Sequence, residues 1–208
     1  MKDDFDVRNG GPIADAPTHT SLLIRVRSND ENGWRRLVRL YEPLVVRWCR
    51  RMGLAEENAA DVSQEVFQAV TKQIGQFRRE RAGDSFRGWL YGITRNKVLD
   101  VWRKQADSPA AIGGSTIQQW FQQTPDQYDA KSEDAPQEFQ EVLRRAMDLV
   151  QVEFTDKSWK AFWQVTIEGR KAVDVAADLE ISPGAVYIAK SRVLKRLREE
   201  LDGLEEIE

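Results

Sequence analysis

The chain has 208 residues, of which 41% are hydrophobic and 31% charged, and its formal net charge is −3. These values are typical of a soluble globular protein with one large or two small domains. They exclude a membrane-spanning helix, because no run of about 18 apolar residues occurs, and the first residues lack the apolar stretch of a secretory signal. We therefore expect a cytoplasmic protein without membrane contact.

The charges are segregated along the chain. Residues 78–104 contain eight basic residues and three acidic ones, and residues 186–198 contain five basic residues and no acid. Acidic residues gather in residues 107–141 and 199–208. Local patches decide where phosphates bind, so the negative net charge does not exclude a nucleic-acid partner. Solvated helix faces are the alternative interpretation of such runs.

The N-terminal half is predicted to be helical after a short arm. Residues 1–19 contain glycines and prolines without periodicity and predict a disordered N-terminal arm. Residues 20–104 are expected to form the first helical domain. Pro43 could kink a helix there or separate two helices. Apolar residues recur at three- and four-residue steps, as a helix with one buried face requires, and these are Trp34, Leu37, Val38, Tyr41, Leu44, Val45 and Trp48.

An acidic ridge is predicted in the next helix. Asp61, Gln64, Glu65 and Gln68 follow the i, i+3, i+4, i+7 spacing that places side chains on one helix face. On spacing alone, a solvated surface helix is the simpler interpretation. The opposite side is expected to be buried and consists of Val62, Val66, Ala69, Val70 and Ile74.

A basic segment follows, residues 76–86, and leads into a helix over residues 87–103 that mixes aromatic and basic side chains. Cations and aromatic surfaces together suit single-stranded DNA, whose phosphates need positive charge and whose unstacked bases need a ring or a pocket. We interpret Trp89, Leu90 and Ile93 as core residues. The loop and its basic positions are the better functional candidates.

The C-terminal half is predicted to be a second helical domain. Residues 105–136 are rich in proline, glycine and glutamine, which indicates a flexible linker. Helical signals return over residues 137–204, and residues 205–208 form an acidic tail. No alternating β pattern occurs. The expected fold is all-α, with two small helical domains joined by a flexible linker, and the C-terminal domain contains a helix-turn-helix.

The helix-turn-helix lies in residues 171–197. Its first helix is short and amphipathic, and its apolar residues are Val173, Val175, Ala176 and Leu179. We expect Ser182 to cap the second helix and Pro183 to occupy the first helical position. Glu180 stands where glycine is usual, because this residue of the turn tends to adopt a positive φ.

The second helix of this motif has two distinct faces. Its apolar side consists of Val186, Ala189, Val193, Leu197 and Leu201. Its polar and basic front suits a DNA major groove and consists of Tyr187, Lys190, Ser191, Arg192, Lys195 and Arg196. An αα-hairpin in a helical bundle is the structural alternative.

Two motifs follow each other along this chain, one in each predicted domain. The first consists of Asp61-x-x-Gln64-Glu65-Val66-Phe67 and of Phe86-Arg87-Gly88-Trp89-Leu90-Tyr91-x-Ile93-x-Arg95-Asn96, and the second is the helix-turn-helix with Val186 and the run Lys195–Arg198. Together they resemble the extracytoplasmic-function (ECF) subfamily of bacterial RNA polymerase sigma factors over residues 20–104 and 140–204. Residues 184–194 are also similar to members found in planctomycetes.

The resemblance implies a sigma factor that binds core RNA polymerase and directs promoter recognition and DNA melting in transcription initiation. It implies that Asp61, Gln64, Glu65 and Phe67 dock on the clamp helices of the largest polymerase subunit. The loop over residues 76–86 would capture a flipped base of the −10 element, and the following helix would contact and melt that element. The expected −10 contacts are Arg78, Arg79, Arg81, Ser85, Arg87, Tyr91, Arg95, Asn96, Lys97 and Arg103.

The resemblance also implies that the helix over residues 182–195 reads the −35 element. The expected contacts are Ser182, Gly184, Ala185, Tyr187, Ile188, Lys190, Ser191, Arg192 and Lys195. The expected partners are core RNA polymerase and promoter DNA, and an anti-sigma factor or another regulator is a further candidate. Trp120 and Phe121 of the linker are candidates for a polymerase contact.

Two other classes of protein fit parts of the pattern. One is a dimeric helix-turn-helix regulator that acts independently of core polymerase, and sizing would reveal its dimer. The other is an interaction module that sequesters a transcription protein without touching DNA. Such a module would tolerate neutralisation of Lys190, Arg192 and Lys195, whereas a sigma factor would not.

No enzyme activity, cofactor or metal site is predicted. His19 is the only histidine and Cys49 the only cysteine, so neither a zinc cluster nor a disulfide can form within the chain. No glycine-rich phosphate loop precedes a lysine and a serine or threonine. Cys49 is expected to be a small buried hydrophobe on a helix.

Overall fold

The computed structural model describes residues 21–80, 84–106, 128–202 and 204. These residues form helices joined by turns and loops, with no strand among them, so the all-α prediction is confirmed for this part of the chain. Within these ranges, each helix is too short or too polar to cross a lipid bilayer. The helices are α1 (Leu22–Arg27), α2 (Glu31–Arg51), α3 (Glu56–Gln73), the 3₁₀ helix η1 (Ile74–Gln76), α4 (Phe86–Ala106), α6 (Ala135–Gln151), α7 (Asp156–Thr166), α8 (Ala172–Leu179) and α9 (Pro183–Leu201).

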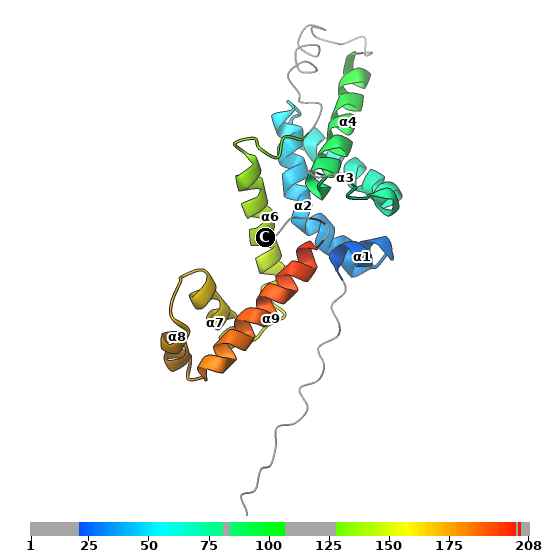
Figure 1. Cartoon of the computed structure of the whole chain (residues 1–208). Helices are drawn as coiled ribbons and strands as arrows, with labels where there is room; N and C mark the ends of the chain where they lie inside the picture. The colour runs from blue at the N-terminus through cyan, green and yellow to red at the C-terminus, as the bar shows by residue number, and fades with distance from the viewer. Residues whose placement is uncertain (1–20, 81–83, 107–127, 203, 205–208) are drawn as a thin grey trace, which may run out of the picture.

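Helix α2 is the centre of the first unit, which consists of α1 to α4. Helices α1, α3 and α4 all pack against it, as Figure 1 shows. The predicted buried face of α2 is confirmed for Leu37, Tyr41, Leu44, Val45 and Trp48, which expose 0% of their surface, while Trp34 and Val38 are partly buried against the same core. The helix also passes through Pro43 without ending, and Pro43 itself is exposed to solvent.

Cys49 lies inside the same helix and is fully buried. Burial raises the pKa of its thiol to about 12, because a thiolate would lose its hydration there. The thiol is therefore protonated at neutral pH and chemically inert. The prediction that Cys49 serves as a small buried hydrophobe is confirmed.

The second unit consists of α6 to α9. Helix α7 packs on α8 and α9, and α8 packs on α9. The core between these three helices is made mostly of small side chains, which let the helices approach closely. It consists of Ala161, Ala172, Val175, Ala176, Val186 and Ala189.

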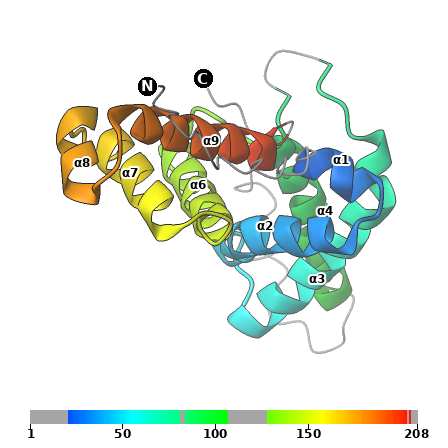
Figure 2. The ribbon, with the colours of Figure 1, turned by 90° about the horizontal axis from the view of Figure 1, so that it is seen from below.

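The two units lie against each other. Helix α6 packs along α2, and α9 reaches α1. Figure 2 shows α9 running from α8 at one end to α1 at the other. Val142 and Ala146 of α6 belong to the same buried cluster as the core of α2. Apolar packing therefore continues from one unit into the other.

A buried carboxylate joins α6 to α2. Glu138 is 1% exposed, and its Oε1 accepts a hydrogen bond from Trp48 Nε1 at 2.8 Å. Its Oε2 accepts from the Tyr128 hydroxyl at 2.9 Å, and Arg51 Nη1 lies 3.3 Å from Oε1. A buried carboxylate without such partners would be strongly destabilising. The two partners of Oε1 belong to α2, so Glu138 connects α6 to α2.

The helix ends differ slightly from the predicted boundaries. Helix α4 continues to Ala106, and α6 begins at Ala135, inside the predicted linker over residues 105–136. Pro136 was taken as a linker residue, but it occupies the first turn of α6, where its missing N–H removes no helical hydrogen bond.

Several predicted segments lie outside the described residues. These are the arm over residues 1–19, the linker residues 107–127 with Trp120 and Phe121, and the tail over residues 205–208. The division into two domains on a flexible linker stays a prediction.

Candidate functional site

The predicted acidic ridge lies on the outer face of α3. Asp61, Gln64 and Gln68 are exposed, while the predicted apolar side packs inward. Glu65 is partly covered, because its Oε2 pairs with Lys97 Nζ of α4 at 3.1 Å. Phe67 is 9% exposed and belongs to the core. The structure therefore brings the acidic ridge next to the basic helix α4, with Phe67 beneath it.

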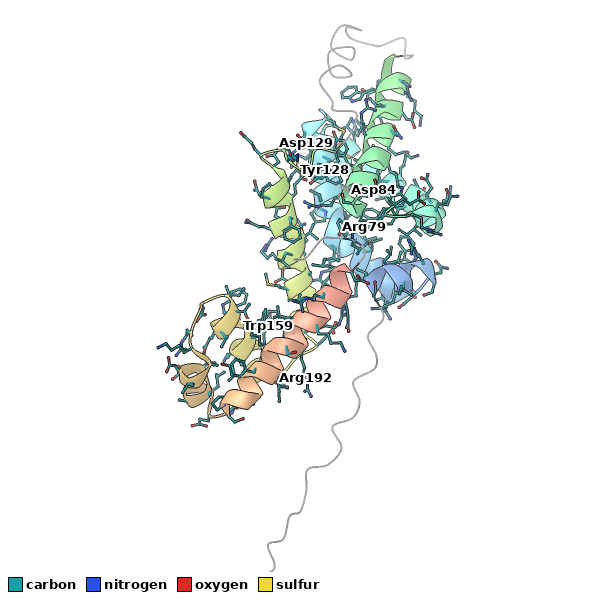
Figure 3. All side chains as sticks on the ribbon, viewed as in Figure 1. Arg79, Asp84, Tyr128, Asp129, Trp159 and Arg192 are labelled. Atoms are coloured by element: carbon teal, nitrogen blue, oxygen red, sulfur yellow. The ribbon has the colours of Figure 1, made fainter. Side chains whose placement is uncertain are left out.

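The basic loop between η1 and α4 is shaped by Asp84. The carbonyl oxygen of Asp84 accepts from Arg79 Nε at 3.1 Å, and its carboxylate accepts from the backbone N–H of Glu80 at 3.0 Å. Figure 3 shows Arg79 and Asp84 close together on this loop. Arg78 donates to the carbonyl oxygens of Gly75 and Phe77 and is exposed, as Arg79 is. Arg81 lies outside the described residues.

Helix α4 presents some of its predicted site residues to solvent and keeps others inside. Asn96 and Arg103 are exposed, and Arg103 pairs with Asp100 at 2.7 Å. Arg95 and Lys97 are half-buried. At the start of the helix, Ser85 Oγ accepts from the backbone N–H of Gly88 at 3.0 Å, which satisfies one of the free donors of the first turn.

Tyr91 and Arg87 face the interior of the protein. The Tyr91 ring packs edge-on against Trp48, with ring centroids 5.3 Å apart, and burial raises the pKa of its phenol. Arg87 donates to the carbonyl oxygen of Ala135 at 3.1 Å and lies over the rings of Tyr128 and Phe139. Both side chains therefore connect α4 to neighbouring elements rather than to solvent.

The turn between α8 and α9 has the predicted local geometry. Glu180 adopts the left-handed conformation with φ 53° and ψ 50°. Ser182 Oγ accepts from the backbone N–H of Ala185 at 3.1 Å, and Pro183 is the first residue of α9. The predicted cap is confirmed. The left-handed Glu180 carries strain that a glycine would not.

Helix α9 separates into the two predicted faces. Its apolar side, from Val186 to Leu201, is buried as predicted. Tyr187 and Ile188 are 61% and 55% exposed. Ser182, Gly184, Ser191, Arg192 and Lys195 are exposed, and Ala185 and Lys190 are half-buried. Figure 3 shows Arg192 on the side of α9 away from α7 and α8.

Two exposure predictions in this region were wrong. Arg196, expected on the groove-facing front, is 5% exposed and binds Glu153 at 2.7 Å and Glu200 at 2.8 Å. It lies one turn after the buried Val193, so its backbone position belongs to the inner side. Val173, expected to be apolar core, is 66% exposed, because the covered face of α8 consists of Ala172, Val175 and Ala176.

Buried acids were missed by the sequence reasoning. Glu138 and Glu200 are each 1% exposed, although both lie in acidic runs that suggested solvated surface. A signal was present for Glu200, which stands four residues after Arg196 and directly before the core residue Leu201. Charged pairs at that spacing beside apolar core positions can be buried ion pairs.

The sequence is similar to one family model and to curated relatives of the same family. Residues 37–107, which span most of α2 through α4, match the family described as Sigma-70 region 2. The chain is 30% identical over 185 residues to the ECF RNA polymerase sigma factor SigD of Mycobacterium bovis, which covers 87% of this chain and 82% of that protein. SigD of Mycobacterium tuberculosis gives the same values of 30%, 87% and 82%.

Two solved complexes are also similar over most of their length. The RsbN–BldN complex has a TM-score of 0.34 and 16% identity, and covers 84% of this chain and 96% of that chain. The complex of CnrH with the cytosolic domain of CnrY has a TM-score of 0.35 and 22% identity. The similarity covers 85% of this chain and 92% of the matched chain of that complex. Because both TM-scores and both identities are low, the family relationship is shown by the sequence relatives and not by these two structures.

Replacing Glu180 by glycine tests the geometry of the turn. We expect Glu180→Gly to raise the free energy of unfolding by about 1 kcal/mol, because relief of left-handed strain exceeds the entropic cost of glycine. Ala177→Gly is the matched control on exposed helical backbone and should lower it by about 1 kcal/mol. Denaturant unfolding of both variants checks this. A loss of stability in Glu180→Gly equal to that of the control would contradict the left-handed turn.

Proposed function

Because the chain belongs to the ECF sigma factors, which bind core RNA polymerase and direct promoter recognition and DNA melting, we propose that its exposed faces divide this task. Helix α3 docks on the polymerase, the loop before α4 and α4 itself engage the −10 element, and α9 reads the −35 element. The observation that carries the proposal is the separation of an exposed acidic face on α3 from an exposed basic helix, α9, in the other unit.

The polymerase contact is assigned to Asp61, Gln64 and Glu65, with the clamp helices of the largest subunit as their target. Asp61 and Gln64 are free to reach a partner because they are exposed. The Glu65 side chain keeps 46% of its surface exposed beside Lys97. Phe67 contributes from beneath, since its ring holds the ridge on the core. Polar residues on a rigid helix supply specific contacts with little loss of conformational freedom.

The −10 contact is assigned to the loop and the exposed edge of α4. Arg78, Arg79, Asn96, Lys97 and Arg103 supply cations and amide groups for phosphates and bases of a melted strand. We assign the capture of a flipped base to the loop before α4, because the exposed Arg78 and Arg79 can bind the phosphates beside an extruded base. Arg87 and Tyr91 act from inside by fixing the position of α4, and Ser85 caps it.

The −35 contact is assigned to the front of α9. Lys190, Arg192 and Lys195 can neutralise phosphates at the groove edges. The exposed Tyr187 and Ile188 offer apolar surface for base edges such as the thymine methyl group. The backbone N–H of Gly184 in the first turn can bind a phosphate, whereas that of Ala185 already donates to Ser182 Oγ.

The proposal includes the cellular context of these contacts. Two weak DNA contacts on one chain reinforce each other, because binding of the first raises the effective concentration of the second. The predicted linker would permit this simultaneous binding. A sigma factor acts where RNA polymerase is, so we assign the chain to the cytoplasm and to a non-enzymatic role. An anti-sigma factor or another regulator is the expected controlling partner.

The polymerase contact is tested by Gln64→Ala combined with Glu65→Ala. We expect binding to core RNA polymerase to weaken by about tenfold or more, because the variant loses the polar contacts of both side chains. A tenfold loss of affinity corresponds to about 1.4 kcal/mol of binding free energy. Titration of labelled protein with core polymerase measures this. Glu56→Ala with Gln73→Ala is the matched control, since it removes the same residue types from exposed positions of α3 outside the ridge. If the two double variants bind core polymerase with equal affinity, the ridge is not the docking site.

The DNA contact of α9 is tested by Arg192→Gln with Lys195→Gln. We expect transcription from the cognate promoter to fall strongly while core binding is unchanged, because these cations touch only DNA in the proposal. The salt dependence of holoenzyme binding to promoter DNA should also decrease, by about one unit of slope for each lost phosphate contact. Arg35→Gln with Arg39→Gln removes the same charge from exposed positions of α2 and should leave transcription intact. Full transcription by the α9 variant would reject the assignment.

A further inference from the structure

Two arginine side chains meet at the start of the loop that leads into α4. Arg27, in the last turn of α1, donates from Nη2 to the carbonyl oxygen of Phe77 at 2.6 Å. Arg78 donates from Nη1 to the same oxygen at 2.8 Å. These two nitrogen atoms are therefore at most about 5.4 Å apart. Helix α1 also packs on η1, directly before the loop.

The charges of these two arginines are not balanced by a carboxylate. Among the residues that the structure describes, the partners of Arg27 and Arg78 are backbone oxygens, since Arg78 also donates to the Gly75 carbonyl oxygen at 2.7 Å. Arg25, two residues before Arg27, differs in this respect because it pairs with Asp30 at 2.7 Å. The start of the loop thus holds two adjacent positive charges.

This arrangement is electrostatically unfavourable without an anion. Burial and the positive charge of Arg78 both lower the pKa of the Arg27 guanidinium, because low hydration and a neighbouring cation disfavour the charged form. Arginine nevertheless stays protonated in proteins, so the repulsion persists. A bound anion between the two guanidinium groups would remove it.

The geometry suits a phosphate group. Charged N–H···O bonds have lengths of about 2.7–2.9 Å, so two nitrogen atoms up to about 5.8 Å apart can bind one phosphate oxygen. Each guanidinium has about five N–H donors, and the backbone oxygens leave several of them unused on both side chains. Arg27 and Arg78 are exposed, so these donors are accessible to a ligand.

A single DNA strand is the source of phosphate that the position favours. Phe77 and Arg78 begin the loop to which we assign the −10 element, and a base held by that loop would bring the phosphates beside it to the same place. Ile24, one turn before Arg27 on α1, is 54% exposed and offers apolar surface for a sugar ring.

We propose that Arg27 and Arg78 form a phosphate site for the melted strand of the −10 element. The site adds α1 to the DNA interface, and a phosphate between the two guanidinium groups connects α1 to the start of the loop. The contact is made to the DNA backbone, so it positions the strand without reading its sequence. This inference rests on the proposed function, which assigns the loop to the −10 element.

The site is tested in the holoenzyme with a fluorescent single-stranded oligonucleotide that carries the −10 element of the cognate promoter. We expect Arg27→Gln to weaken binding by about fivefold, the upper range for one exposed ion pair. The slope of log affinity against log salt concentration should decrease by about 0.7, the value for one phosphate contact on a single strand. Arg27→Lys keeps the charge and should retain the wild-type slope. Fluorescence anisotropy at several salt concentrations measures both quantities.

Replacing the phosphates of the oligonucleotide one at a time by uncharged methylphosphonates locates the contact. At one position the replacement should weaken binding by the wild type but not by Arg27→Gln, because the same contact cannot be lost twice. Arg78→Gln should be insensitive at the same position. Arg35→Gln is the control, since it removes an exposed arginine of α2 whose partner is Glu31, and it should change neither the slope nor the pattern.

Two outcomes would overturn the phosphate site. One is an unchanged salt slope of Arg27→Gln with additive effects at every phosphate, which would limit Arg27 to a structural role in the loop. The other is weaker binding of Arg27→Gln to core RNA polymerase without DNA, which would assign the pair to a carboxylate of the polymerase. Both leave the proposed function intact if the wild-type holoenzyme binds the oligonucleotide. A wild-type holoenzyme that does not bind it contradicts the proposed function as well.

Discussion

The arrangement of the helices depends on a carboxylate that lies between them. Glu138 is 1% exposed and is held by Trp48 from α2 and by Tyr128 from the segment before α6. Loss of either donor would leave a buried carboxylate short of a partner, which is strongly destabilising. The joint therefore holds α6 on α2, and α9 packs on α6 in turn.

This constraint connects stability to function. The structure leaves the acidic ridge of α3 and the front of α9 exposed, so the faces that we assign to polymerase and to the −35 element need no unfolding to become available.

Much of the local structure was predictable from the sequence, because it is set by neighbouring residues. The buried face of α2 follows from apolar spacing, and the cap at Ser182 and Pro183 follows from the chemistry of a helix start. The misplaced residues depend on distant partners. Arg196 is buried because it binds Glu153, which is 43 residues away in sequence. Glu138 is buried because it accepts a hydrogen bond from Trp48, which is 90 residues away. The residue pattern within one helix does not predict contacts with residues so distant in sequence.

The most direct test of the joint is a double-mutant cycle between Trp48→Phe and Glu138→Leu, which removes the donor and the acceptor in turn, measured by the free energy of unfolding in denaturant. Such a cycle isolates the interaction between two residues from the separate cost of changing each one. A hydrogen bond to a charged group predicts a coupling of about 1.5–3 kcal/mol. If the two changes are simply additive, Trp48 and Glu138 do not interact, and the joint cannot be what holds α6 and α9 in place.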